Sequence, residues 1–266
     1  MCSSDLIPAS AGIAWIREGF AIFRKQPGGL MLLMLAYLLA GVVLGIIPFL
    51  GQWLPMILAP VFTAVFVQAC AAADRKQTLT PDMLRPIFQK PNFPRLAGLG
   101  ALFVLVLAGL AMLFAAVVGM DTMRQLAEQQ VQPDAAAAAA AANGNFGWAM
   151  LVIFLLSLPL SMAMLFAAPL IFWQQMRVGK ALFYSFFAVW RTLRAFLLYF
   201  LCWVAIVMLL TNVVLLLLGK TLLGMAVLQS ALMIIVMVIQ CSVYAAYKAI
   251  FGEPELPGAG PSQPAA

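Results

Sequence analysis

The sequence predicts an all-α, polytopic membrane protein with six transmembrane helices, arranged as three hairpins with cytoplasmic interfacial helices. The 266-residue chain is 65% hydrophobic and 9% charged, and its mean hydropathy is +1.05. Soluble domains average about 45–50% apolar and about 25% charged residues, so this chain cannot cover a soluble fold of its size with polar surface. It also contains six uncharged stretches, each long enough to cross a bilayer, which takes about 20 residues.

The six apolar stretches divide the chain into three parts. Residues 1–29 form a cytoplasmic segment with an interfacial helix, 30–247 form the transmembrane domain with a low-complexity outer loop at 120–147, and 248–266 form a disordered cytoplasmic tail. Met1–Leu6 resembles translated sequencing-adapter DNA, so no functional inference rests on it. The predicted spans are Leu30–Leu50, Trp53–Ala73, Leu96–Gly119, Trp148–Trp173, Ala195–Leu218 and Thr221–Tyr247.

The distribution of Lys and Arg predicts the orientation. If the N-terminus is cytoplasmic, 13 of the 15 basic residues lie in cytoplasmic segments and two, Arg124 and Lys220, lie in outer loops. Positive charge is retained on the cytoplasmic side of spanning helices, so both termini are expected there. Aromatic residues at the span ends, namely Trp53, Trp148, Trp173, Tyr244 and Tyr247, are expected to lie at the two membrane interfaces.

A repeated unit is indicated by two basic segments, Gly19–Lys25 and Phe186–Thr192, which align at a constant offset and each precede a span. We interpret the chain as three copies of an interfacial helix followed by a hairpin. The middle copy is weak, because four prolines between positions 81 and 94 break any long helix there. Apolar stripes are expected to face the membrane; in the first copy they are Ile13, Ile16, Phe20 and Phe23, and in the third Phe183, Phe187 and Trp190. The alternative is an ordinary helix packed under the bundle.

Basic side chains beside these stripes suggest contact with anionic lipid. Arginine has a rigid fork of donors suited to phosphate, and its stem can lie along apolar surface. The hypothetical lipid contacts are Arg17, Arg24, Lys25, Arg191 and Arg194. The alternative is that these charges only determine topology.

Polar residues within the spans are few. Asn212 and Gln229 fall at similar depth on either side of Lys220, and Gln68 and Gln240 both lie in the inner third, so each pair is a candidate for an intramembrane hydrogen bond. Such residues are expected to hold helices together, with a polar substrate path as the alternative. The GxxxG of Gly41–Gly45 is expected to pack within the bundle, with a dimer face as the alternative.

Catalytic and cofactor sites are not expected. The chain has no histidine, which excludes the commonest general base and metal ligand. Its four cysteines, Cys2, Cys70, Cys202 and Cys241, form no CxxC pair, and no phosphate-binding loop is present. We therefore expect a non-enzymatic protein with no cofactor and no metal.

Several segments resemble a family of uncharacterised six-span inner-membrane proteins of Gram-negative bacteria. They are Gly12–Pro27 (GIAWIREGFAIFRKQP), Ile47–Gly51 (IPFLG), Pro60 and Gln68–Arg75 (QACAAADR). The layout is also similar to the membrane domain of some glycerophosphodiester phosphodiesterases, without their catalytic domain. The resemblance implies an inner-membrane location and no established activity.

The function expected from these observations is a lipid-interacting or scaffold role in the cell envelope. A small permease or channel for an uncharged or lipid-like solute is the alternative. Membrane lipids are the expected partners, together with a second copy of the chain or other membrane proteins, and no nucleic acid is expected because the basic clusters lack an exposed domain to hold it.

Overall fold

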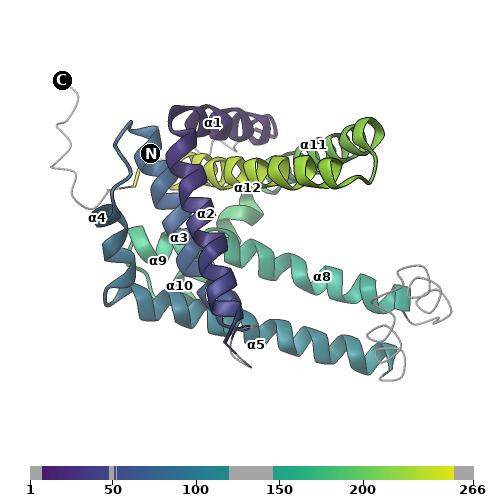
Figure 1. Ribbon diagram of the computed structural model, residues 1–266. Coiled ribbons are helices and arrows are strands. Elements are labelled where there is room, and N and C mark those ends of the chain that lie inside the picture. Colours follow the sequence, from purple (N-terminus) through teal and green to yellow (C-terminus); the bar gives the residue numbers. More distant parts are fainter. Residues whose placement is uncertain (1–7, 48–50, 52, 120–145, 255–266) are drawn as a thin grey trace.

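The computed structural model describes residues 8–47, 51, 53–119 and 146–254. Most of the predicted outer loop and most of the predicted tail lie outside these residues. The described part contains helices and no strands (Figure 1). Its elements are α1 (Ala11–Lys25), α2 (Pro27–Gly45), α3 (Leu54–Asp74), α4 (Pro81–Leu84), the 3₁₀ turn η1 (Arg85–Phe88), α5 (Asn92–Val118), α8 (Phe146–Leu165), α9 (Ala167–Trp173), α10 (Val178–Arg191), α11 (Leu193–Leu218) and α12 (Leu222–Phe251).

The six predicted spans are confirmed as helices long and apolar enough to cross a membrane. Five are single helices, whereas the fourth breaks at Phe166 into α8 and α9. Pro169 explains the break, because a proline ring clashes with the carbonyl group four residues earlier, here that of Leu165. The all-α, six-span fold class is therefore correct.

The three copies of the repeated unit are visible in the order of elements. A helical segment predicted to be cytoplasmic precedes each hairpin: α1 precedes α2 and α3, the short α4 and η1 precede α5 and α8–α9, and α10 precedes α11 and α12. The prolines of the middle copy do limit it to a four-residue helix and a 3₁₀ turn.

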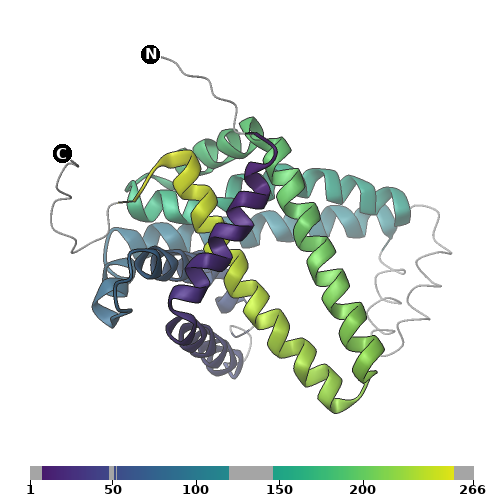
Figure 2. The same cartoon turned by 90° about the horizontal axis from the view of Figure 1, so that it is seen from above.

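Each of these segments packs against the hairpin of the preceding copy, and the segment of the first copy packs against the hairpin of the last. Thus α1 lies across α12 and α11, α4 and η1 contact α3, and α10 packs on α8 and α9 (Figures 1 and 2). Through these contacts, each hairpin is connected to another copy by the helical segment that precedes that copy's own hairpin.

The core lies where the second helices of the hairpins converge, at the predicted cytoplasmic ends. The C-terminal half of α3, the short α9 and the last third of α12 are buried almost continuously, including Phe66, Leu170 and Tyr244. Away from this core the hairpins diverge (Figures 1 and 2), and their side chains face outward, as Leu105 and Leu216 do. Lipid tails are as apolar as leucine, so a spanning helix can leave such surface to the bilayer.

The predicted interfacial position of two aromatic residues is wrong. Tyr244 and Tyr247 are both 1% exposed and belong to the core, where Trp173 packs against both rings. Trp53 and Trp148, at the opposite ends of their spans, are exposed as expected for interfacial rings.

Candidate functional site

Helix α1 carries two apolar faces. Gly12, Trp15, Gly19 and Ile22 are buried against the protein. The predicted stripe is offset from this face, and two of its members, Ile13 and Phe20, are about 45% exposed. The inner face attaches the helix to the third hairpin, which leaves Ile13 and Phe20 of the predicted stripe exposed, whereas Ile16 is half-buried and Phe23 packs partly against the core.

The close approach of α1 depends on its two buried glycines. A Cβ atom at Gly19 would lie 2.6 Å from the Cβ of Ser242 in α12, and one at Gly12 would meet the backbone of Ala195 in α11. With no side chain at either position, the backbone of α1 can rest directly on the hairpin.

Helix α10 has the same division of faces. Ala181, Ser185 and Val189 are buried, and the Ser185 hydroxyl donates to the carbonyl of Met162 at the distance of 2.8 Å. The predicted stripe of Phe183, Phe187 and Trp190 is 44–61% exposed. An exposed row of three large aromatic rings is a surface suited to a membrane interface.

The stripes of the two helices correspond residue by residue. The alignment offset pairs Ile16 with Phe183, Phe20 with Phe187 and Phe23 with Trp190, and it places Arg24 opposite Arg191 in the last turn of each helix. The same design, an apolar row ending in an arginine directly before a span, therefore occurs twice.

The basic residues predicted to contact lipid differ in the contacts that they make with other residues of the protein. Arg17, Arg191 and Arg194 are exposed, and no hydrogen bond or ion pair within the described residues involves them. The Arg24 guanidinium lies 4.9 Å from the centroid of the Phe20 ring, on the stripe itself. Lys25 differs, since its ammonium lies 2.5 Å from a carboxylate oxygen of Asp74, so we leave it out of the lipid set.

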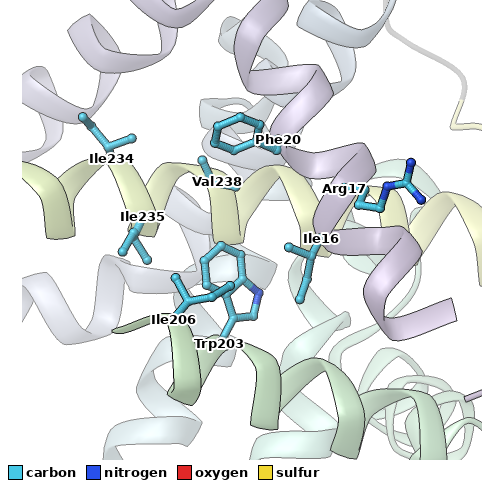
Figure 3. A pocket seen from close by; sticks show the side chains of 8 residues that line it. All are labelled: Ile16, Arg17, Phe20, Trp203, Ile206, Ile234, Ile235 and Val238. Atoms are coloured by element: carbon cyan, nitrogen blue, oxygen red, sulfur yellow. The ribbon is translucent and has the colours of Figure 1, made fainter. Parts of the chain in front are cut away.

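A groove of about 420 Å³ lies between α1 and the third hairpin (Figure 3). Pockets of ~300–1,000 Å³ hold small molecules. Arg17 is the one charged residue among those that line the groove, and the other lining side chains are apolar or aromatic. Its walls are Ile16, Arg17 and Phe20 of α1, Trp203 and Ile206 of α11, and Ile234, Ile235 and Val238 of α12.

A cluster of charges joins the helices at the predicted cytoplasmic end of the core. The Asp74 carboxylate at the end of α3 binds the ammonium groups of Lys25 and Lys248, the latter at 3.1 Å, and Lys248 also lies 3.1 Å from the Glu253 carboxylate. Asp74 and Glu253 are not among the site residues that the sequence predicts. Both acids lie at the ends of spans, Asp74 at the end of α3 and Glu253 just after α12, and this placement could have predicted that they lie close together. In this cluster each charged group lies beside a group of opposite charge, and the arrangement indicates a structural role.

The predicted intramembrane pairs do not form. Asn212 donates to the carbonyl of Met208 in its own helix, and no hydrogen bond within the described residues joins it to Gln229. Gln68 accepts from the indole N–H of Trp173 at 2.8 Å, and no hydrogen bond there joins it to Gln240. A short polar side chain in a helix reaches the backbone one turn earlier more easily than a partner across a hairpin.

The GxxxG segment is not a packing site within this chain. A Cβ atom at Gly41 or Gly45 would meet no atom within 4 Å, so the expected packing within the bundle is wrong. The alternative of a dimer face stays untested.

The comparisons with known proteins agree with a membrane location. The chain is 29% identical over 262 residues to a protein of Burkholderia thailandensis described as a probable inner membrane protein, and the match covers 95% of each chain. Together with the six spans, this similarity supports a multi-pass location in the bacterial inner membrane. No family model and no solved structure matches the chain. The similarity to the membrane domain of glycerophosphodiester phosphodiesterases stays a prediction.

Proposed function

We propose that this multi-pass inner membrane protein is non-enzymatic, has both termini in the cytoplasm and binds anionic phospholipid of the inner leaflet through α1 and α10. The observation that carries the proposal is the repeated exposed stripe, which ends in Arg24 on one helix and Arg191 on the other. In the proposed orientation both arginines face the inner leaflet, where a cation near anionic lipid gains about 1 kcal/mol.

The protein itself offers these arginines no carboxylate partner in its described part. Lys25, Lys248 and Arg95, by contrast, are each bound by a carboxylate or a backbone carbonyl. A lipid phosphate would supply the missing acceptors for Arg24 and Arg191, and arginine can bind it with two parallel hydrogen bonds.

A permease for an uncharged solute is less well supported. Ser157, Ser161, Asn212 and Ser230 each donate to a carbonyl of their own helix. Polar groups used in this way do not present a continuous path across the membrane.

The test is the double substitution Arg24→Gln and Arg191→Gln. The matched control is Lys76→Gln with Arg85→Gln, which removes two exposed charges outside the stripes. Both variants keep 11 of the 13 predicted cytoplasmic charges, so the orientation should persist, and a protease-accessibility assay verifies it. Native mass spectrometry then counts the anionic lipids retained after detergent purification.

We expect the stripe variant to retain fewer anionic lipids than the parent, and the control variant to retain as many as the parent. Equal retention by a correctly oriented stripe variant and the parent would overturn the proposal and leave these arginines a purely topological role.

A further inference from the structure

We propose that the groove between α1 and the third hairpin binds one acyl chain of an anionic glycerophospholipid, with Arg17 at the phosphate and the Trp203 indole N–H at an ester carbonyl. The inference rests on the proposed inner-leaflet orientation of α1. It concerns residues other than Arg24 and Arg191, so the two ideas can fail separately.

The walls of the groove match a hydrocarbon chain. Ile206, Ile234 and Phe20 are each about 40–45% exposed along its opening, and the Trp203 ring closes its floor. Because α11 and α12 are spanning helices, the opening faces the region that lipid chains occupy. An acyl chain entering it would cover apolar surface from three helices at once.

The charge at the rim identifies the headgroup. Arg17 lies on the exposed side of α1, and no carboxylate among the described residues pairs with it. In Figure 3 its guanidinium extends away from the apolar side chains that line the groove. A cation at the mouth of an apolar groove complements a lipid that has a phosphate at one end and a hydrocarbon chain at the other.

The indole N–H of Trp203 is the second observation that points to a ligand. The residue is 8% exposed, and its Nε1 atom has no hydrogen-bond partner. The neighbouring Tyr199 ring lies edge-on to Trp203, and its hydroxyl is hydrogen-bonded to the Ser242 hydroxyl at 2.8 Å. A buried donor without a partner is unfavourable, and tryptophan usually bonds this group.

An ester carbonyl would supply the missing acceptor. In Figure 3 the indole nitrogen lies on the side of the ring nearer Ile16, a residue of the α1 wall. The indole nitrogen is buried, so an ester carbonyl can reach it only when the side chains around it move. Arg17 and this N–H then fix the two polar parts of the lipid, the phosphate and the ester.

The experiment uses the full chain in vesicles of phosphatidylethanolamine and phosphatidylglycerol, with a trace of phosphatidylglycerol that carries a photoactivatable diazirine in one acyl chain. After illumination, peptide mass spectrometry locates the labelled residues. We expect labels at Ile206 and at Ile234–Val238. Labels spread evenly over the exposed spans, with no excess at the groove, would overturn the inference.

Three variants separate the contributions. Ile206→Trp fills the groove and should abolish its labelling, while Leu216→Trp, at an 86% exposed position on the same helix, should leave it unchanged. Arg17→Gln should reduce groove labelling about five-fold, the effect of losing one cation at the lipid surface. Trp203→Phe keeps a ring but removes the N–H, and it should lower the labelling as well.

The outcomes also distinguish this inference from the proposed function. Groove labelling that persists in the Arg24→Gln, Arg191→Gln variant supports the groove even if lipid retention shows that the stripes bind no lipid. An unlabelled groove, together with reduced retention in that variant, overturns the groove alone. Labelling by a photoactivatable free fatty acid as strong as that by the phospholipid would also overturn it, since the phosphate and ester contacts would then be unnecessary.

Discussion

The ammonium group of Lys248, near the end of the sixth span, lies 3.1 Å from the carboxylate of Asp74 at the end of the second. The same carboxylate binds Lys25, which connects α1 with the first and the third hairpin. The Asp74 side chain is 14% exposed, so its two partners lose a largely shielded acceptor if the carboxylate is removed.

Replacing this carboxylate should destabilise the protein. Asp74→Asn leaves Lys25 and Lys248 with a neutral partner, and the loss of charged hydrogen bonds costs about 1–3 kcal/mol. Thermal unfolding in detergent measures the change. Asp82→Asn, which removes an exposed acid, is the control and should unfold like the parent. Equal midpoints for the two variants would show that the cluster does not stabilise the core.

A second prediction compares alanine substitutions at two glycines, which should change the free energy of unfolding in different directions. Gly19→Ala forces a Cβ atom against Ser242 and should cost about 1–3 kcal/mol through overpacking. Gly28→Ala, at a helical position with open space, should be neutral or stabilise by up to about 1 kcal/mol, because alanine favours the helix. Unfolding midpoints of both variants check this. A tolerated Gly19→Ala would mean that α1 does not rest on α12 as closely as described.

The spans and the repeat could be predicted from sequence because the bilayer itself fixes the length and composition of a spanning helix. The sequence could not predict, however, which side of α1 is covered by the rest of the protein. The sequence shows one apolar row through Ile13 and Phe20 and another through Trp15 and Ile22, and only the packing of α12 decides which is buried. The hydrogen bond of Gln68 with Trp173 escaped prediction for the same reason, since it depends on which hairpins meet.

The described cysteines should be reduced in the native protein. Cys70, Cys202 and Cys241 lie in spans toward the predicted cytoplasmic side, where thiols stay reduced. The structure adds that the sulfur atoms of Cys70 and Cys241 are 2.7 Å apart, which makes them the pair that a crosslink would join. Alkylation of denatured protein, prepared without reductant, should modify all three. A reproducible Cys70–Cys241 crosslinked peptide would contradict the expected compartment.

The final prediction is that both termini face the cytoplasm. Reversing the topology would place 13 positive charges outside, against the two that the proposed topology places there. Lys220 is the one basic residue between α11 and α12, in the turn that this topology places outside. A phosphatase active only in the periplasm, fused after Ala266, should therefore be silent, whereas the same enzyme inserted within residues 135–142 should be active. A fluorescent protein that matures only in the cytoplasm should give the reverse pattern at the same two sites, which controls for expression. An active phosphatase at the C-terminus together with a silent one at 135–142 would invert the topology and place the arginines of α1 and α10 at the outer leaflet.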